Sequence, residues 1–147
     1  MYLQKAFYIG AQHEWNNVSG NVEISKNGKK VSVELKDIDE VLCQAAYWRK
    51  VNQIHAWFVK NVQEGVDDCK RYSVARVQLK ELIDICKKVL TDHTLAETLL
   101  PTQSGFFFGS TVYDEYYFKN IEGTVNQLEQ LDLSDDGECY YYYQSSW

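Results

Sequence analysis

Three residue types that bind planar ligands recur at helical spacing in the first half of the chain. Trp48, Asn52 and His55 stand at positions i, i+4 and i+7, which places them on one stripe of a helix beside its apolar face. The indole can stack on a ring, and the amide and imidazole can form hydrogen bonds. The stripe can therefore line a pocket, or it can be a buried polar network that fixes a neighbouring loop. The sequence favours the buried network, but both interpretations stay open.

The loop that would meet this stripe is unusually apolar. Residues 100–114 contain the only proline of the chain and three consecutive phenylalanines between two glycines. We predict that the loop is an internal plug beneath the helix, with the structural residues Pro101, Gly105, Phe106, Phe107, Phe108 and Gly109. In the pocket interpretation, polar groups face each other across a cavity, and Arg49 or Arg76 meets a phosphate. The loop residues of that candidate site are Ser104, Ser110, Thr111, Tyr113 and Asp114.

Acid–base, metal and nucleophilic chemistry are less well supported. Asp114 could pair with His55 in space, but no carboxylate accompanies His55 in the sequence. The histidines do not follow HxxxH or HExxH spacing, and the four cysteines form no CxxC pair. Ser104 does not lie in a GxSxG turn, and the glycine pair of the loop lacks the lysine of a P-loop. We therefore predict no catalytic residue, no metal and no cofactor.

The composition is that of a globular protein with many aromatic residues. Of the 147 residues, 45% are hydrophobic and 14% are aromatic, and the net charge is −6. The negative charge argues against direct binding of nucleic acid, which needs clustered lysines and arginines. Mimicry of nucleic acid is a less favoured possibility, because the acidic residues are dispersed. Since no apolar run is long enough to span a bilayer, and widely spaced cysteines suit free thiols, we expect a cytoplasmic protein with no membrane contact.

Strand patterns dominate the first forty residues. Residues 2–9 form a short apolar-rich run that ends at Gly10. Between residues 22 and 35, apolar and polar residues alternate on either side of Asn27-Gly28, a pair that is typical of a tight hairpin turn. The tyrosine-rich residues 139–143 have strong strand propensity. They could return to the edge of the sheet, form an interface strand or be disordered.

Helical periodicity dominates residues 41–131. The spacing predicts helices over 41–63, 76–91 and 114–131, with a short helical turn over 94–99 that Pro101 ends. Asp37 or Asp39 could cap the first helix, and Thr94 the short turn. We predict a single α+β domain over residues 1–147, in which an N-terminal antiparallel sheet with the hairpin packs on about three helices. Residues 132–147 form an acidic turn and the tyrosine-rich tail.

Two long motifs resemble a family of small uncharacterised proteins of tailed bacteriophages and prophages. The motifs are WRKxNxIHxWF at residues 48–58 and LPTxSGFFFGSTxYD at residues 100–114, and the resemblance covers about residues 45–131. It implies an accessory protein that acts in the cytoplasm of an infected bacterium. Together with the tyrosine- and tryptophan-rich composition, it predicts a non-enzymatic protein that binds and inhibits a host protein, such as a counter-defence factor of the anti-CRISPR kind.

The alternative is a small-ligand protein that sequesters or processes a nucleotide signal. It corresponds to the pocket interpretation of the stripe that contains Trp48 and His55. A homo-oligomer is compatible with either function, because the sheet edge and the tyrosines of the tail suit self-association.

Overall fold

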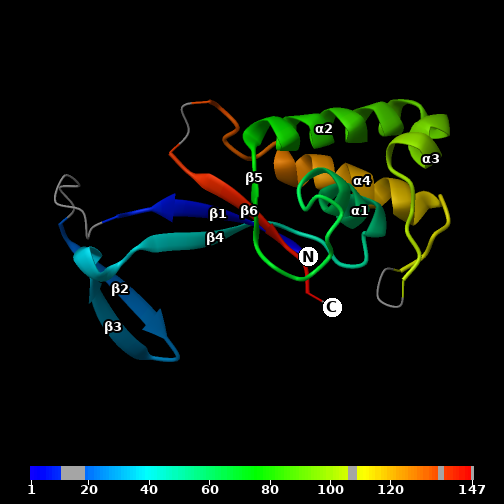
Figure 1. The fold of residues 1–147 in the computed structure, drawn as a ribbon. Coiled ribbons are helices and arrows are strands. Elements are labelled where there is room, and N and C mark those ends of the chain that lie inside the picture. Colours follow the sequence, from blue (N-terminus) through cyan, green and yellow to red (C-terminus); the bar gives the residue numbers. More distant parts are fainter. Residues whose placement is uncertain (11–18, 106–108, 136–137, 147) are drawn as a thin grey trace.

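The computed structural model describes residues 1–10, 19–105, 109–135 and 138–146 (Figure 1). It confirms the predicted α+β class, with helices and antiparallel sheets. The main sheet has four strands in the order β4-β1-β6-β5. Its strands are β1 (Tyr2–Tyr8), β4 (Glu40–Tyr47), β5 (Tyr72–Val74) and β6 (Tyr140–Gln144).

Strand register determines which side of this sheet is buried. Leu3 of β1 pairs with Ala46 of β4 and with Tyr143 of β6, and all three side chains are buried. On the opposite side of β1, Ala6 pairs with Leu42 and Tyr140, which are both exposed. The main sheet therefore buries one face against the helices and leaves part of the other uncovered.

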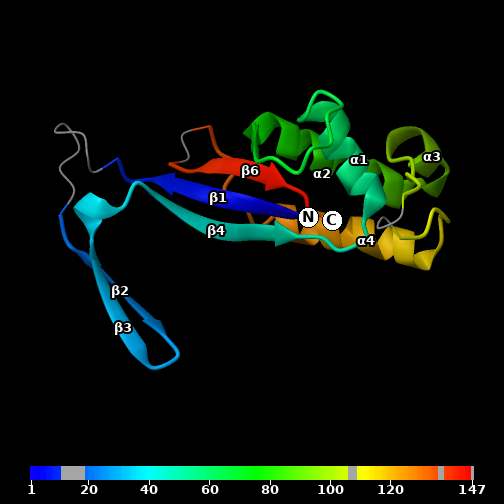
Figure 2. The same cartoon turned by 60° about the horizontal axis from the view of Figure 1, so that its bottom comes forward.

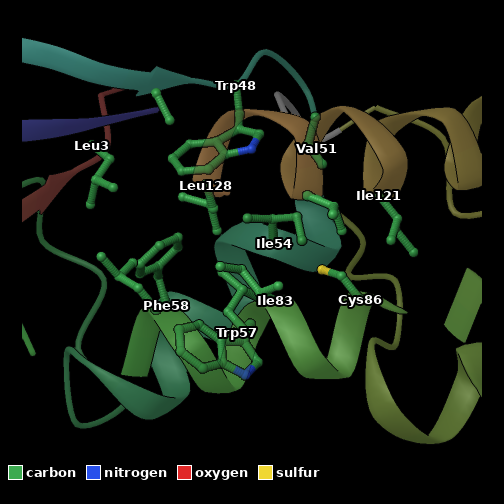
Figure 3. Close-up of a cluster of buried hydrophobic side chains, with 14 of the residues drawn as sticks. Leu3, Trp48, Val51, Ile54, Trp57, Phe58, Ile83, Cys86, Ile121 and Leu128 are labelled. Atoms are coloured by element: carbon green, nitrogen blue, oxygen red, sulfur yellow. The ribbon is translucent and has the colours of Figure 1, made fainter. Parts of the chain in front are cut away.

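The helices pack on the buried face of the sheet (Figure 3). They are α1 (Asn52–Asn61), α2 (Arg76–Thr91), the 3-10 turn η2 (His93–Leu95), α3 (Ala96–Leu99) and α4 (Glu115–Leu128). Phe58 of α1 stacks on Tyr143 of β6, with ring centroids 4.0 Å apart and planes at 7°. This stack joins the first long helix to the centre of the sheet.

The predicted hairpin forms a separate arm. Strands β2 (Asn21–Lys26) and β3 (Lys29–Glu34) pair only with each other among the described strands, and the 3-10 turn η1 (Leu35–Asp37) follows. Asn27 and Gly28 both have positive φ, as a two-residue turn of this kind requires. We call residues 21–36 the arm. It projects away from the helices in both views (Figures 1 and 2), so this hairpin is not a part of the sheet that packs on the helices.

The first predicted helix begins much later than expected. Residues 41–47 belong to β4, where they pair with β1, and α1 starts only at Asn52. Between these elements, Lys50 has φ of 59°, a left-handed conformation that a continuous right-handed helix excludes. Val51 occupies the N-cap position, so neither Asp37 nor Asp39 caps this helix.

The later helices follow their predicted boundaries closely. The helix predicted over 76–91 is confirmed as α2, and α4 has Asp114 as its N-cap, whose carboxylate accepts a hydrogen bond from Tyr117 N at 3.0 Å. The short turn has a different cap from the predicted Thr94. The Asp92 carboxylate accepts from the backbone N of Thr94 at 3.0 Å, so the cap lies two residues earlier and the turn begins at His93.

The tail lies inside the sheet and not at its edge. Strand β6 has β1 on one side and β5 on the other. Its side chains Tyr141 and Tyr143 are fully buried in the core, so this strand also contributes to the face that packs on the helices. The three-residue strand β5, which the sequence analysis did not predict, occupies the edge.

Candidate functional site

The three residues of the predicted stripe are all buried, but they do not share one helix. Trp48 lies between β4 and α1, whereas Asn52 and His55 lie on α1. Their exposed fractions are 3%, 1% and 0%. Each makes a hydrogen bond to a different part of the chain.

Trp48 links the sheet to α4. Its indole Nε1 donates to Thr124 Oγ1 at 3.0 Å, and its ring packs against Phe58 with centroids 5.6 Å apart. Backbone bonds with Met1 hold the residue from both directions, because Trp48 N donates to the Met1 carbonyl and the N-terminal amine donates to the Trp48 carbonyl. The indole is therefore enclosed by the core, where it has no open face for a planar ligand.

Asn52 holds the two limbs of the apolar loop together. Its Nδ2 donates to the Ser110 carbonyl at 2.8 Å, and its Oδ1 accepts from Gln103 N at 2.9 Å. One buried amide thus satisfies two backbone groups on opposite sides of residues 104–109. These are the loop-backbone contacts that the buried-network interpretation expects of Asn52.

Gly109 allows the loop to approach the start of α1. Its φ is +84°, and a Cβ built on it would lie 3.0 Å from the Lys50 carbonyl oxygen. The limbs are also joined by Thr102, whose N donates to the Tyr113 hydroxyl at 3.2 Å and whose Oγ1 donates to the Thr111 carbonyl at 3.0 Å. The predicted insertion of Phe106, Phe107 and Phe108 beneath the helix lies outside the described residues.

The remaining residues of the predicted site are mostly at the surface. Asp114 is the cap of α4, a role that accounts for its position without any contact to His55. Tyr113 is half-buried, and its ring packs edge-on against Tyr117, with centroids 4.9 Å apart. The exposed residues of the predicted set are Arg49, Pro101, Ser104, Gly105, Gly109, Ser110 and Thr111.

His55 is the centre of a buried hydrogen-bonded chain that the sequence analysis did not find. Its Nε2 lies 3.0 Å from Asp67 Oδ2, and its Nδ1 lies 2.7 Å from the Tyr143 hydroxyl. A neutral imidazole protonated at Nε2 satisfies both contacts, because it donates to the carboxylate and accepts from the phenol. The partner predicted for His55 was Asp114, so the carboxylate at this site is a different one, supplied by the turn after α1.

The hydrogen bonds between Asp67, His55 and Tyr143 hold α1 against β6. The Tyr143 hydroxyl belongs to a fully buried side chain, and burial followed by the nearby Asp67 carboxylate raises the pKa of Tyr143. A phenol that keeps its proton and has no exposed surface is a hydrogen-bond donor and not a nucleophile. Asp67 is the member nearest the solvent, with 28% of its side chain exposed.

Neither a metal cluster nor a membrane span is found in the described part of the chain. No group of three or more His, Cys, Asp or Glu side chains among the described residues could hold a metal ion. No helix in the same residues is long and apolar enough to cross a membrane.

The arm has an exposed pair of apolar residues on its two neighbouring strands. Ile24 of β2 and Val31 of β3 face each other across the hairpin, and they are 51% and 56% exposed. Together with Lys26, Asn27 and Lys29 they line an open hollow near the tip. The pattern of alternating residues predicted these strands, but it also suggested that their apolar side would be covered.

No family model, curated protein or solved structure matches this chain. The resemblance to bacteriophage proteins therefore stays a prediction from the two motifs.

Proposed function

We propose that this protein acts by binding another protein, with the arm as the main contact surface. The observation that carries the proposal is the position of Ile24 and Val31. They lie on a two-stranded sheet that stands apart from the helices, and about half of each side chain is exposed (Figure 2).

An arm of this kind favours an interface for two physical reasons. A two-stranded hairpin is only marginally stable by itself in water, so a partner that covers its apolar side stabilises it. In addition, the outer edges of β2 and β3 have backbone groups that can pair with a strand of another protein. For both reasons, binding of a partner should stabilise this uncovered hairpin more than it would stabilise an exposed helix.

Charge separates the arm from the rest of the molecule. Residues 21–36 contain four lysines and two glutamates, which gives the arm a net charge of +2. Because the whole chain carries −6, the remainder carries −8. We expect the arm to dock on an acidic surface, and we expect salt to slow its association.

Exposed residues of the main sheet offer further contacts for a protein partner. Tyr8 is the last residue of β1, and it is 49% exposed. Leu42 and Tyr140 are exposed on the strands that flank β1. Tyrosine is enriched among the residues that contribute most to binding energy at protein interfaces.

The resemblance to bacteriophage proteins suggests the class of partner. We propose a host protein in the cytoplasm of an infected bacterium, with components of antiviral defence such as CRISPR nucleases tested first. In this proposal the protein inhibits its partner by occupying a surface and carries out no reaction itself.

The experiment compares three forms of the tagged protein in affinity purification from a bacterial host. They are the wild type, the arm variant Ile24→Ser with Val31→Ser, and the control Val77→Ser, which changes an exposed valine of α2. We expect wild type and control to recover one host protein at equal stoichiometry, and the arm variant to recover at least about tenfold less. Each form is also tested for inhibition of the purified partner.

Two results would contradict the proposal. Equal recovery of the partner by the arm variant would show that the arm is not the interface. Failure to recover a stoichiometric partner, together with no effect on any host defence system, would overturn the proposed function itself.

A further inference from the structure

Strand β4 forms an unprotected edge of the main sheet (Figures 1 and 2). Among the described strands only β1 pairs with it, so its other side has backbone groups that can pair with a further strand. Proteins commonly protect such edges by keeping the strand short or by placing charges or proline in it. The opposite edge strand, β5, has three residues, whereas β4 has eight, and residues 41–47 contain no charge and no proline.

The hydrogen bonds between β4 and β1 show which backbone groups point to the open side. The Asp39 carbonyl accepts from Ile9 N at 2.9 Å, so the backbone of Asp39 points toward β1. This direction alternates along an antiparallel strand. The backbone groups of Glu40, Leu42 and Gln44 therefore point away from β1 and form the free edge.

A bulge and a helix limit this edge at one end. Ala45 has no partner in β1, because the register shifts there, and it forms a bulge. Beyond the bulge, Tyr47 N donates to Gln127 Oε1 of α4 at 2.9 Å, so this group already has a partner. The stretch that is open to regular pairing is therefore residues 40–44, and Leu42 is its central residue.

The side chains of this stretch are accessible on both faces of the sheet. Val41 is 37% exposed and Leu42 is 43% exposed, although neighbouring residues of a strand point to opposite faces. Cys43 is exposed as well. Glu40 is the only charged residue of the stretch, and its carboxylate lies 3.2 Å from the Arg71 guanidinium. A strand that approaches this edge thus meets apolar side chains and one compensated charge.

The stretch is complementary to itself in an antiparallel arrangement. A two-fold axis at Leu42 places the two copies of Leu42 opposite each other, and Val41 opposite Cys43 of the partner subunit. It also places Glu40 opposite Gln44 of the partner subunit, whose amide can donate to the carboxylate. Apolar residues then face apolar residues, and no two like charges face each other. This matters in a chain with a net charge of −6.

We propose that two copies of this protein form a symmetric dimer by antiparallel pairing of their β4 edges about Leu42. The two main sheets then become one continuous sheet, and the outward backbone groups of residues 40–44 gain partners. Because the same edge is used by both copies, association stops at the dimer. An axis at Cys43 would instead place Leu42 opposite Gln44 of the partner subunit. The contact uses β4 and not the arm, so it does not depend on the proposed function.

Analytical ultracentrifugation of the full chain, kept reduced, tests the dimer. We expect the wild type to change from monomer to dimer as its concentration rises. Leu42→Lys should raise the Kd of the dimer at least about tenfold, because it places two like charges opposite each other at the axis. Val77→Lys is the matched control. It adds the same charge at an exposed valine of α2, and it should leave the Kd unchanged.

A charge swap tests whether Leu42 lies on the axis. Leu42→Glu should weaken the dimer as Leu42→Lys does, since like charges again face each other. A mixture of the two variants should form heterodimers, because opposite charges then meet across the axis. Circular dichroism spectra that match the wild type show that each variant is folded, so a loss of dimer is not a loss of fold.

Disulfide formation tests the register. In the proposed pairing, Val41 and Cys43 of the partner subunit form a non-hydrogen-bonded pair, with Cα atoms about 4.5 Å apart, within the range of a disulfide. Val41→Cys should therefore give a dimer linked between residues 41 and 43 when diamide is the oxidant. The two Cys43 residues of the wild type are diagonal neighbours about 7–8 Å apart, and they should not crosslink. Mass spectrometry identifies the linked peptides.

Four results would overturn the inference. A wild type that stays monomeric up to its solubility limit would exclude the dimer. A Leu42→Lys variant that dimerises as tightly as the wild type would place the contact elsewhere. A mixture of the two charge variants that stays monomeric would remove Leu42 from the axis. A wild-type link between the two Cys43 residues, with no link between residues 41 and 43 in the Val41→Cys variant, would contradict the register.

Discussion

At the residue scale, the conformations of Lys50 and Gly109 fix how the apolar loop meets α1. Both residues have positive φ, and Gly109 lies directly against the Lys50 backbone. One residue further along the chain, Ser110 accepts the hydrogen bond from Asn52. A substitution at any of these residues should therefore disturb the loop more than the core.

Gly109→Ala should destabilise the protein by about 1–3 kcal/mol. The added Cβ would be held at positive φ and would lie 3.0 Å from the Lys50 carbonyl oxygen, so the backbone would have to move. Urea denaturation followed by circular dichroism measures the change. A variant as stable as the wild type would show that the loop is not held against Lys50.

Tyr143→Phe should cost about 1–3 kcal/mol of unfolding free energy, because it leaves His55 Nδ1 buried without its phenol partner. Tyr140→Phe is the matched control. It removes the same hydroxyl from a tyrosine on the same strand that is 56% exposed, and it should change stability by less than about 0.5 kcal/mol. If both variants lost equal stability, the contact between His55 and Tyr143 would not be the cause.

At the element scale, the most accurate predictions concern α2, α4 and the turn of the arm. Each of these depends on residues close together in the sequence: the apolar stripe of α2, the Asp114 cap of α4, and the Asn27-Gly28 pair. The predicted start of the first helix at residue 41 was wrong. Residues 41–47 form β4, because pairing with β1 outweighs the helical spacing of these residues. Local pattern alone does not include that competing interaction.

Gly123→Ala should stabilise α4 by about 0.5–1 kcal/mol. Gly123 lies inside the helix, and a Cβ there would meet nothing within 4 Å. Alanine would therefore gain helix propensity without a clash. Thermal unfolding measures the effect, and a lower melting temperature would contradict the open space beside this glycine.

At the scale of the whole molecule, the reactivity of the cysteines depends on whether the protein is folded. All four described cysteines are free thiols, of which Cys43 is exposed and Cys86 is fully buried. Burial raises the pKa of the Cys86 thiol to about 12. The thiolate, which is the reactive form, is therefore rare at Cys86 even where a reagent could reach it.

Labelling with a thiol reagent at pH 8 should modify Cys43 rapidly and Cys86 only when the protein unfolds. Mass spectrometry of digested samples measures the two rates separately. We expect the Cys86 rate to rise with denaturant in proportion to the unfolded population, while the Cys43 rate stays nearly constant. Rapid modification of Cys86 in buffer would show that the helical core opens locally.

The sequence by itself determined the α+β class, the turn of the arm, α2 and α4. These features depend on periodicity, capping and turn chemistry, which act over a few residues. Only the tertiary structure decided that β6 lies inside the sheet and that His55 bonds to Tyr143, which is 88 residues away in the chain. It also decided that the apolar side of the arm stays uncovered, because burial depends on which elements meet in space and not on the pattern within one of them.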